Sequence, residues 1–207
     1  MADLPINIAD IITPYHINVN EITSLVVSAN SKSRMIRSGS QYFSMEMGIK
    51  PRNMMRHPDE FWRIATFLQS NPTFSAPMHN MQASKFAINE GLTLQSTNVT
   101  SGAAIGATRV AVSSSQNYNA GQYVKFGSRT KVYQVTTADS TYIYLSTPLR
   151  QVVGQGDLCI WREDGWNGET FDGIMGLFNN EDFGNPSHKI EDGIMGTFNN
   201  LVLREVI

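Results

Sequence analysis

The sequence predicts a mainly β protein with one packed α-helix, built as a first β module followed by a small antiparallel β-barrel or sandwich module. Apolar residues recur at helical spacing in one stretch of the 207-residue chain, residues 58–70. The segments around it alternate apolar and polar residues, and the middle of the chain carries short β-rich runs separated by turn signals. We therefore expect residues 1–90 to form the first module, residues 91–162 the second, and residues 163–207 a Gly- and Asn-rich arm that ends in a strand.

The first module opens with extended segments. Residues 21–28, EITSLVVS, have the apolar character of a buried strand, whereas residues 31–40, SKSRMIRSGS, are polar, basic and Gly-containing. We interpret the basic run as a solvated hairpin loop or arm, because so short a run without interleaved aromatic residues is more typical of a loop than of a phosphate site. Residues 42–49 alternate strictly and predict a half-buried strand. Its apolar face consists of Phe43, Met45, Met47 and Ile49.

Residues 58–70, PDEFWRIATFLQS, predict an amphipathic helix of about three turns. Pro58 suits the first helical position, where its missing N–H would be unpaired in any case. Asp59 and Glu60 complement the positive end of the helix dipole, and Pro72 stops the helix. A helix this short is unstable alone in water, so its apolar stripe needs to be buried against the neighbouring sheet. The stripe consists of Phe61, Ile64, Ala65 and Leu68.

The second module is predicted from six short β-rich runs at nearly even spacing. Hairpin-length connections separate several of them, at residues 127–129 and 138–140. Six short strands without a helix favour a small barrel or sandwich, closed so that no long edge is exposed. The runs are residues 92–94, 108–112, 122–126, 131–136, 141–145 and 158–161.

A nine-residue phrase occurs twice near the C-terminus. Residues 172–180 read DGIMGLFNN and residues 192–200 read DGIMGTFNN. Two copies are too few for a solenoid. They are compatible with two equivalent apolar tips that dock into equivalent grooves, with a pseudo-symmetric hairpin, or with a duplication that merely lengthens a loop.

The polar surroundings of this phrase do not suffice for a core of its own. We therefore expect the segment to be ordered by a neighbouring subunit or an adjacent protein. Residues 201–207, LVLREVI, have the character of a last strand that returns to a sheet. The candidate interface residues are Ile174, Met175, Phe178, Ile194, Met195 and Phe198.

The composition argues against several classes of partner. A net charge of −2 with 16% charged residues provides neither a basic field for nucleic acid nor an acidic tail. No apolar run approaches the roughly 18 to 20 residues that span a bilayer, and the N-terminus lacks the features of a signal peptide. We expect a soluble protein made in a cytoplasm that binds neither nucleic acid nor membrane. The low charge and the ten methionines favour surfaces that partners cover.

The sequence offers no constellation of catalytic or metal-binding residues, so we expect no enzyme, no cofactor and no metal. The four histidines lack metal-ligand spacing. The single cysteine, Cys159, lies in an apolar strand with no histidine nearby in sequence, which favours an inert core thiol over a nucleophile. Adjacent carboxylates such as Glu163 and Asp164 are more typical of solvated residues than of a glycosidase pair. Residues 102–106 lack the Lys-Ser or Lys-Thr of a phosphate loop.

The order of parts carries a family resemblance. An opening Leu-Pro-Ile, a basic hairpin, an alternating strand and a helix of the form EFWRIATFLQS are followed by the phrases AGQYVKF, KVYQVT and TPLR. This order resembles tailed-phage distal tail and baseplate hub-like proteins, over about residues 4–161. The resemblance implies a tail-tube-like β module that joins its neighbours in a ring around the tail channel, and a second β module on the outside.

The function that the resemblance implies is that of a structural virion protein of the phage tail tip or baseplate. Its copies are expected to assemble in a ring of sixfold or related symmetry, a hexamer, between tail tube and hub. The implied partners are further copies of the chain, the tail tube and other baseplate or hub proteins. The implied location is the tail of the virion, after synthesis in the host cytoplasm.

A second hypothesis is a carbohydrate- or receptor-binding adaptor of the phage tail, in which the β-rich half binds a host-surface saccharide. A cell-wall hydrolase is a more distant third. A row of exposed aromatic residues would favour the adaptor, because sugars stack on aromatic rings. We prefer the interpretation that these residues are ordinary strand formers with half-buried rings. They are Tyr118, Tyr123, Tyr133, Tyr142 and Tyr144.

Overall fold

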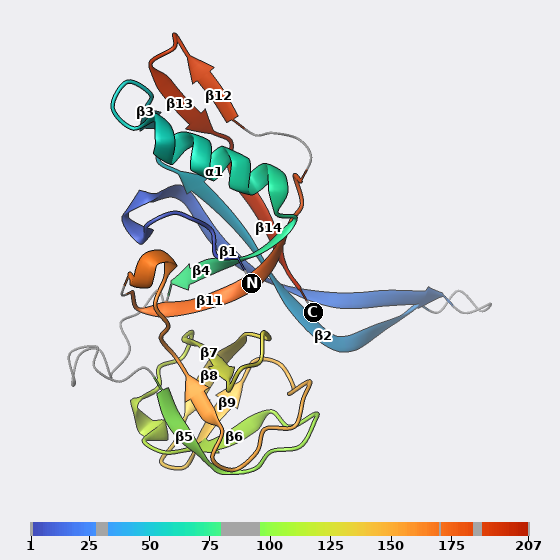
Figure 1. The fold of residues 1–207 in the computed structure, drawn as a ribbon. Coiled ribbons are helices and arrows are strands. Elements are labelled where there is room, and N and C mark those ends of the chain that lie inside the picture. The colour runs from blue at the N-terminus through green and yellow to red at the C-terminus, as the bar shows by residue number, and fades with distance from the viewer. Residues whose placement is uncertain (1, 28–32, 80–95, 170, 184–187, 207) are drawn as a thin grey trace.

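The computed structural model describes residues 2–27, 33–79, 96–169, 171–183 and 188–206. Within these ranges the chain forms a five-stranded sheet, one α-helix, a closed six-stranded barrel and a small three-stranded sheet (Figure 1). The predicted fold class, mainly β with one packed helix and a small closed β module, is confirmed. The helix in the described part of the chain is too short to cross a membrane.

The five-stranded sheet combines strands from both ends of the chain, and all of its neighbouring strands are antiparallel. The alternating strand predicted at residues 42–49 is present, and its four odd-numbered apolar side chains are buried. The last strand returns to this sheet, as predicted from residues 201–207. In spatial order the strands are β1 (Ile11–Val27), β2 (Ser33–Ile49), β14 (Leu201–Glu205), β11 (Gly173–Asn180) and β4 (Thr73–His79).

The basic segment that we expected to be a solvated hairpin loop or arm, residues 31–40, is a strand from Ser33 onward. Its backbone pairs with β1 as far as Ser33 opposite Val27, in a hairpin that extends away from the rest of the molecule (Figure 1). The segment is thus one strand of a hairpin arm, and the loop alternative is wrong from Ser33 onward because it relied on side-chain polarity. Backbone pairing in an exposed two-stranded ribbon needs no apolar face.

The helix α1 (Pro58–Ser70) has the predicted bounds. Its predicted stripe is buried, with Ile64 and Leu68 in the same apolar core as the odd-numbered residues of β2. Phe61, one turn earlier, packs on the ring of Phe198 with a centroid distance of 4.9 Å. The helix ends where Asn71 donates its backbone N–H and its side-chain amide to the carbonyl of Phe67.

Replacing Leu68 by alanine is expected to lower the free energy of unfolding by about 2 to 5 kcal/mol, because the change leaves a cavity between helix and sheet. Urea denaturation of the two proteins measures the difference. The exposed neighbour Gln69, replaced by alanine, is the matched control and should change stability little. A loss below about 0.5 kcal/mol for Leu68→Ala would contradict the observed packing.

The barrel is closed, and each of its strands pairs with two neighbours. Five of the six predicted runs correspond to its strands. The remaining one, residues 92–94, lies outside the described residues. The strand that the sequence did not reveal, β5, is rich in Ser and Thr and has no apolar run. In spatial order the strands are β10 (Leu158–Ile160), β5 (Ser96–Ser101), β6 (Arg109–Val112), β9 (Tyr142–Leu145), β8 (Tyr133–Ala138) and β7 (Tyr123–Phe126).

The barrel is an insertion into the sheet. The chain leaves the sheet after β4, forms the barrel, and returns as β11, which pairs with β4 along its whole length. The expectation of a separate C-terminal arm at residues 163–207 is therefore wrong. Its strands β11 and β14 lie in the middle of the sheet, so the first module is completed only by the last part of the chain.

The two copies of the repeated phrase have different structures. In the first copy, Gly173 begins the long strand β11. In the second, Asp192 and Gly193 both have positive φ, at 50° and 67°, and form the tight turn of a hairpin. The copies form neither a symmetric hairpin nor two equivalent tips. The second copy belongs to the small sheet of β12 (His188–Glu191), β13 (Met195–Phe198) and β3 (Arg52–Asn53).

Candidate functional site

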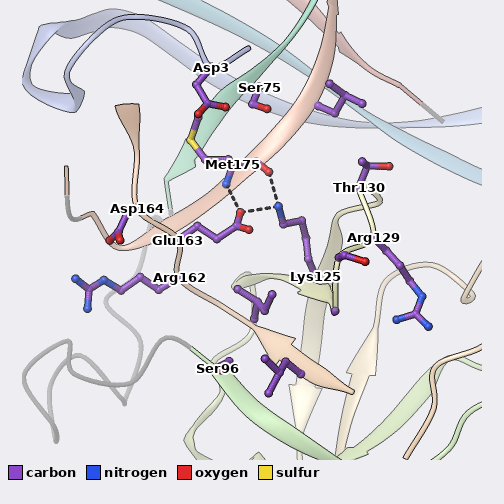
Figure 2. Close-up of a pocket in the computed structure, with 15 residues that line it drawn as sticks. Asp3, Ser75, Ser96, Lys125, Arg129, Thr130, Arg162, Glu163, Asp164 and Met175 are labelled. Carbon is purple, nitrogen blue, oxygen red and sulfur yellow. Dashed lines mark hydrogen bonds and ion pairs between the residues drawn. The ribbon is translucent and has the colours of Figure 1, made fainter. Parts of the chain in front are cut away.

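A pocket of about 540 Å³ lies where the barrel meets the sheet (Figure 2). It combines residues from the N-terminus, from β4, from the barrel and from the segment that leads into β11. Charged side chains and hydroxyl groups predominate among the labelled residues. They are Asp3, Ser75, Ser96, Lys125, Arg129, Thr130, Arg162, Glu163, Asp164 and Met175.

At the centre of the pocket, an ion pair takes the place of a neighbouring strand. The Lys125 ammonium and the Glu163 carboxylate are 2.5 Å apart. Glu163 accepts the backbone N–H of Met175 at 2.8 Å, and Lys125 donates to the carbonyl of the same residue at 2.8 Å. β14 pairs with only the last three residues of β11, and among the described residues no strand pairs with β11 on that side at Met175. The two side chains therefore bind backbone groups that a neighbouring strand would otherwise bind.

A second ion pair joins barrel and sheet nearby. The side chain of Glu205 on β14 is fully buried and lies 2.6 Å from the ammonium of Lys131 in the barrel. The same carboxylate accepts the backbone N–H groups of Val132 and Phe43, each at 3.0 Å. Burial lowers the pKa of Lys131, while the Glu205 carboxylate acts in the opposite direction. One carboxylate thus connects the barrel to two strands of the sheet.

A third ion pair lies at the junction, between Arg129 and Asp157. Arg129 donates to Asp157 at 2.9 Å and to two backbone carbonyls, those of Phe126 and Val152. The backbone N–H of Gly154 and, next, Arg129 lower the pKa of Asp157. Lys125, Glu163 and Arg129 therefore bind one another, a neighbouring carboxylate or the backbone, whereas the Nε of Arg162, which also lines the pocket, is buried without a hydrogen-bond partner among the described residues. The contacts of Lys125 join the barrel to the segment that leads into β11.

Cys159 is fully buried in the barrel, and burial raises the pKa of its thiol to about 12, so a thiolate nucleophile is disfavoured. Within the described ranges, no three His, Cys, Asp or Glu residues come together as a metal site.

The tyrosines do not form the exposed row that a saccharide site in the barrel would need. Tyr118, Tyr123 and Tyr133 are buried, and only Tyr142 and Tyr144 are half-exposed. The hydroxyl of Tyr144 donates to Asp139, and the ring of Tyr142 is covered by the guanidinium of Arg109.

The first copy of the candidate interface is part of the protein's own core. Ile174 and Phe178 have no exposed surface, and Met175 is half-buried beside the Lys125–Glu163 pair. The expectation that these residues need a partner is wrong, because β4 and β14 flank their strand and supply the apolar surroundings that the local sequence lacks.

The second copy is divided. Phe198 packs on Phe61 of the helix and Met195 is half-buried, so both are used within the chain. Ile194 is 46% exposed and remains accessible to a partner. The structure therefore does not bring the six candidate residues together at one surface.

Sequence reasoning missed the residues that do meet at the junction. A usable signal was present, since Glu205 is a charged residue in the apolar terminal strand and Lys125 lies between apolar neighbours in AGQYVKF. A charge inside an apolar strand indicates a buried partner of opposite charge.

Away from the junction with the barrel, Tyr15 of β1 connects the two edge strands of the five-stranded sheet, β1 and β4. Its hydroxyl accepts the backbone N–H of His79 at 2.7 Å and donates to the carbonyl of Pro77 at 3.1 Å. The sheet is therefore curled, with β1 and β4 in contact at this point. A small apolar pocket of about 240 Å³ lies beside them, lined by Ile8, Ile11, Ile12, Tyr15, Pro77 and His79.

Burial raises the pKa of Tyr15 to about 12, from an ordinary value of 10.0. The stability that depends on its neutral form is complete below pH 10 and is lost as the pH rises towards 12. In a rapid pH jump read before unfolding, tyrosinate absorbance of the native protein should contain a component that titrates near pH 12 and is absent from Tyr15→Phe. Identical titrations of the two proteins would contradict the buried position of this hydroxyl.

Comparisons with known proteins do not assign the chain to a family. No protein-family model matches it, and no curated protein is similar enough to count as a relative.

Proposed function

We propose that this protein is a structural, non-enzymatic virion protein of a phage tail tip or baseplate, whose copies assemble as a ring, a hexamer, between tail tube and hub. The fold contains the parts that the resemblance implies, a sheet with one packed helix and a closed β module, although the β module is inserted into the sheet rather than following it. The proposed partners are further copies, the tail tube and other baseplate or hub proteins. The proposed location is the virion tail, after synthesis in the host cytoplasm.

The observation that carries the proposal is the outer edge of β1. Phe43 of β2 donates its N–H to Glu205 on the β14 side, so its paired residue Val19 directs its own N–H and C=O away from β2. Ile17, two residues along the strand, has the same orientation. Among the described strands, β1 pairs only with β2, so its edge beyond the contact of Tyr15 with β4 is open to another strand.

Two apolar side chains of this strand are exposed, among polar ones such as His16 and Asn18. Val19 is 42% exposed and Ile12 is 40% exposed. A long edge strand with exposed apolar residues is a template for pairing with another chain, and soluble proteins usually cover or interrupt it. A ring satisfies the edge, because each copy supplies the neighbour that the previous copy lacks.

Native mass spectrometry of the full chain, together with mass analysis of purified virions, tests the proposal. We expect a ring of six copies and the presence of the chain in tails. Val19→Lys places a charge on the edge strand and should shift the protein towards monomers. Ile105→Lys, the same kind of apolar-to-charged change at an exposed barrel position, should not. A protein that remains monomeric at high concentration and is absent from virions would overturn the proposal.

A further inference from the structure

A groove of about 690 Å³ runs along the outer face of α1. One wall is a second stripe of the helix, formed by residues three and four positions apart. The facing wall consists of the N-terminal segment at Asp3 and Pro5 together with Trp166 of the short 3-10 helix η3 (Trp166–Gly168). The helical stripe consists of Asp59, Trp62, Arg63, Thr66, Phe67 and Ser70.

The walls of this groove are held together by specific contacts. The guanidinium of Arg63 lies 4.3 Å from the ring centroid of Trp166 and joins the helix to η3. The carboxylate of Glu169, next to η3, accepts the backbone N–H of Ile8 at 2.6 Å and joins η3 to the N-terminal segment. The groove is therefore preformed.

The groove also has a partly exposed aromatic ring, Trp62, which contacts the rings of Phe61 and His188 edge-on, and two negative charges that the described fold does not pair. Trp62 is 48% exposed. Within the described residues, no hydrogen bond or ion pair engages the carboxylates of Asp3 and Asp59, whereas Arg63, the cation of the groove, lies on Trp166. Exposed tryptophan is typical of the most strongly contributing residues of protein interfaces.

We propose that this groove binds an extended peptide segment of a partner protein, which places a Lys or Arg side chain on the Trp62 ring. Asp59 and Asp3 neutralise the charge of that side chain. The groove already contains one such contact, since Arg63 lies on Trp166 in the same way. The stripe from Asp59 to Ser70 is about 17 Å long, the length of about five extended residues, and Thr66 and Ser70 offer hydroxyl groups to the peptide backbone.

The charges favour this occupant over a neutral oligosaccharide. A sugar ring can stack on Trp62, but it leaves two carboxylates without a cation. An anionic ligand is disfavoured for the same reason. The inference does not depend on ring assembly, because the groove lies on the helix and the edge proposed for the ring lies on β1.

The test uses the full-length protein on an array of random decapeptides and, in parallel, on an array of neutral oligosaccharides. Bound peptides should be enriched in Lys or Arg, and the affinity of the best peptide should fall as salt is raised. Trp62→Ala should weaken that peptide about 3- to 30-fold, the loss of one cation–π contact. Asp59→Asn, which keeps the shape of the side chain, should also weaken it.

Two exposed residues of the loop after β11 provide matched controls. Phe183→Ala and Asp182→Asn should leave the affinity unchanged. Binding without a preference for basic residues, no enriched peptide, or an affinity that Trp62→Ala and Asp59→Asn leave intact would overturn the proposal. Binding of a neutral oligosaccharide that is lost in Trp62→Ala would also overturn it and would assign the groove to a sugar.

Discussion

Replacing Glu205 by alanine is expected to lower the free energy of unfolding by about 3 to 5 kcal/mol. The change leaves the Lys131 ammonium buried without its carboxylate, and it removes the acceptor of two backbone N–H groups, those of Phe43 and Val132. An unpaired buried charge and unsatisfied buried donors are each expensive. Because these contacts join the barrel to the sheet, urea denaturation should also become less cooperative.

The exposed ion pair between Lys189 and Glu191 provides the control. Glu191→Ala should cost less than about 0.5 kcal/mol, because water screens and replaces a surface pair. The double variant Lys131→Met with Glu205→Leu should recover most of the stability lost in Glu205→Ala, since it removes both charges together. A loss below about 1 kcal/mol for Glu205→Ala would show that this carboxylate does not hold the junction.

The second large effect is expected at Gly173, where alanine should cost at least about 2 to 3 kcal/mol. A Cβ at this position would overlap the carbonyl oxygen of Met78 and lie 2.6 Å from the ring of Phe171. The carbonyl belongs to the paired strand β4 and has no room to move without breaking the ladder. Thermal or urea denaturation measures the loss.

The corresponding residue of the second copy, Gly193, is sensitive for another reason. Nothing lies within 4 Å of a Cβ built there, but φ is +67°, so alanine should cost only about 1 kcal/mol of backbone strain. Gly154, with ordinary contacts and no positive φ, is the neutral control. Equal effects at Gly173 and Gly193 would contradict the different structures of the two copies.

The sequence by itself determined those elements whose local pattern of apolar residues specifies both the kind of secondary structure and the face that is buried. The helical spacing of Phe61, Ile64 and Leu68 and the strict alternation from Phe43 to Ile49 each specify one geometry and one apolar side, and the structure has both. A small barrel or sandwich followed in the same way from short apolar runs between turns, except for β5, which has no such run, and the structure shows that it is a closed barrel.

Only the tertiary structure decided what each copy of the repeated phrase does and which charges meet. The phrase is nearly identical in its two copies, yet Gly173 lies in a strand beside β4 and Gly193 lies in a turn. Local sequence cannot distinguish these outcomes, because strands that are distant in sequence supply the missing apolar surroundings. Lys131 and Glu205 are 74 residues apart, and their meeting depends on where the inserted barrel rests against the sheet. Periodicity specifies the face of an element, whereas the packing of whole modules selects its neighbour.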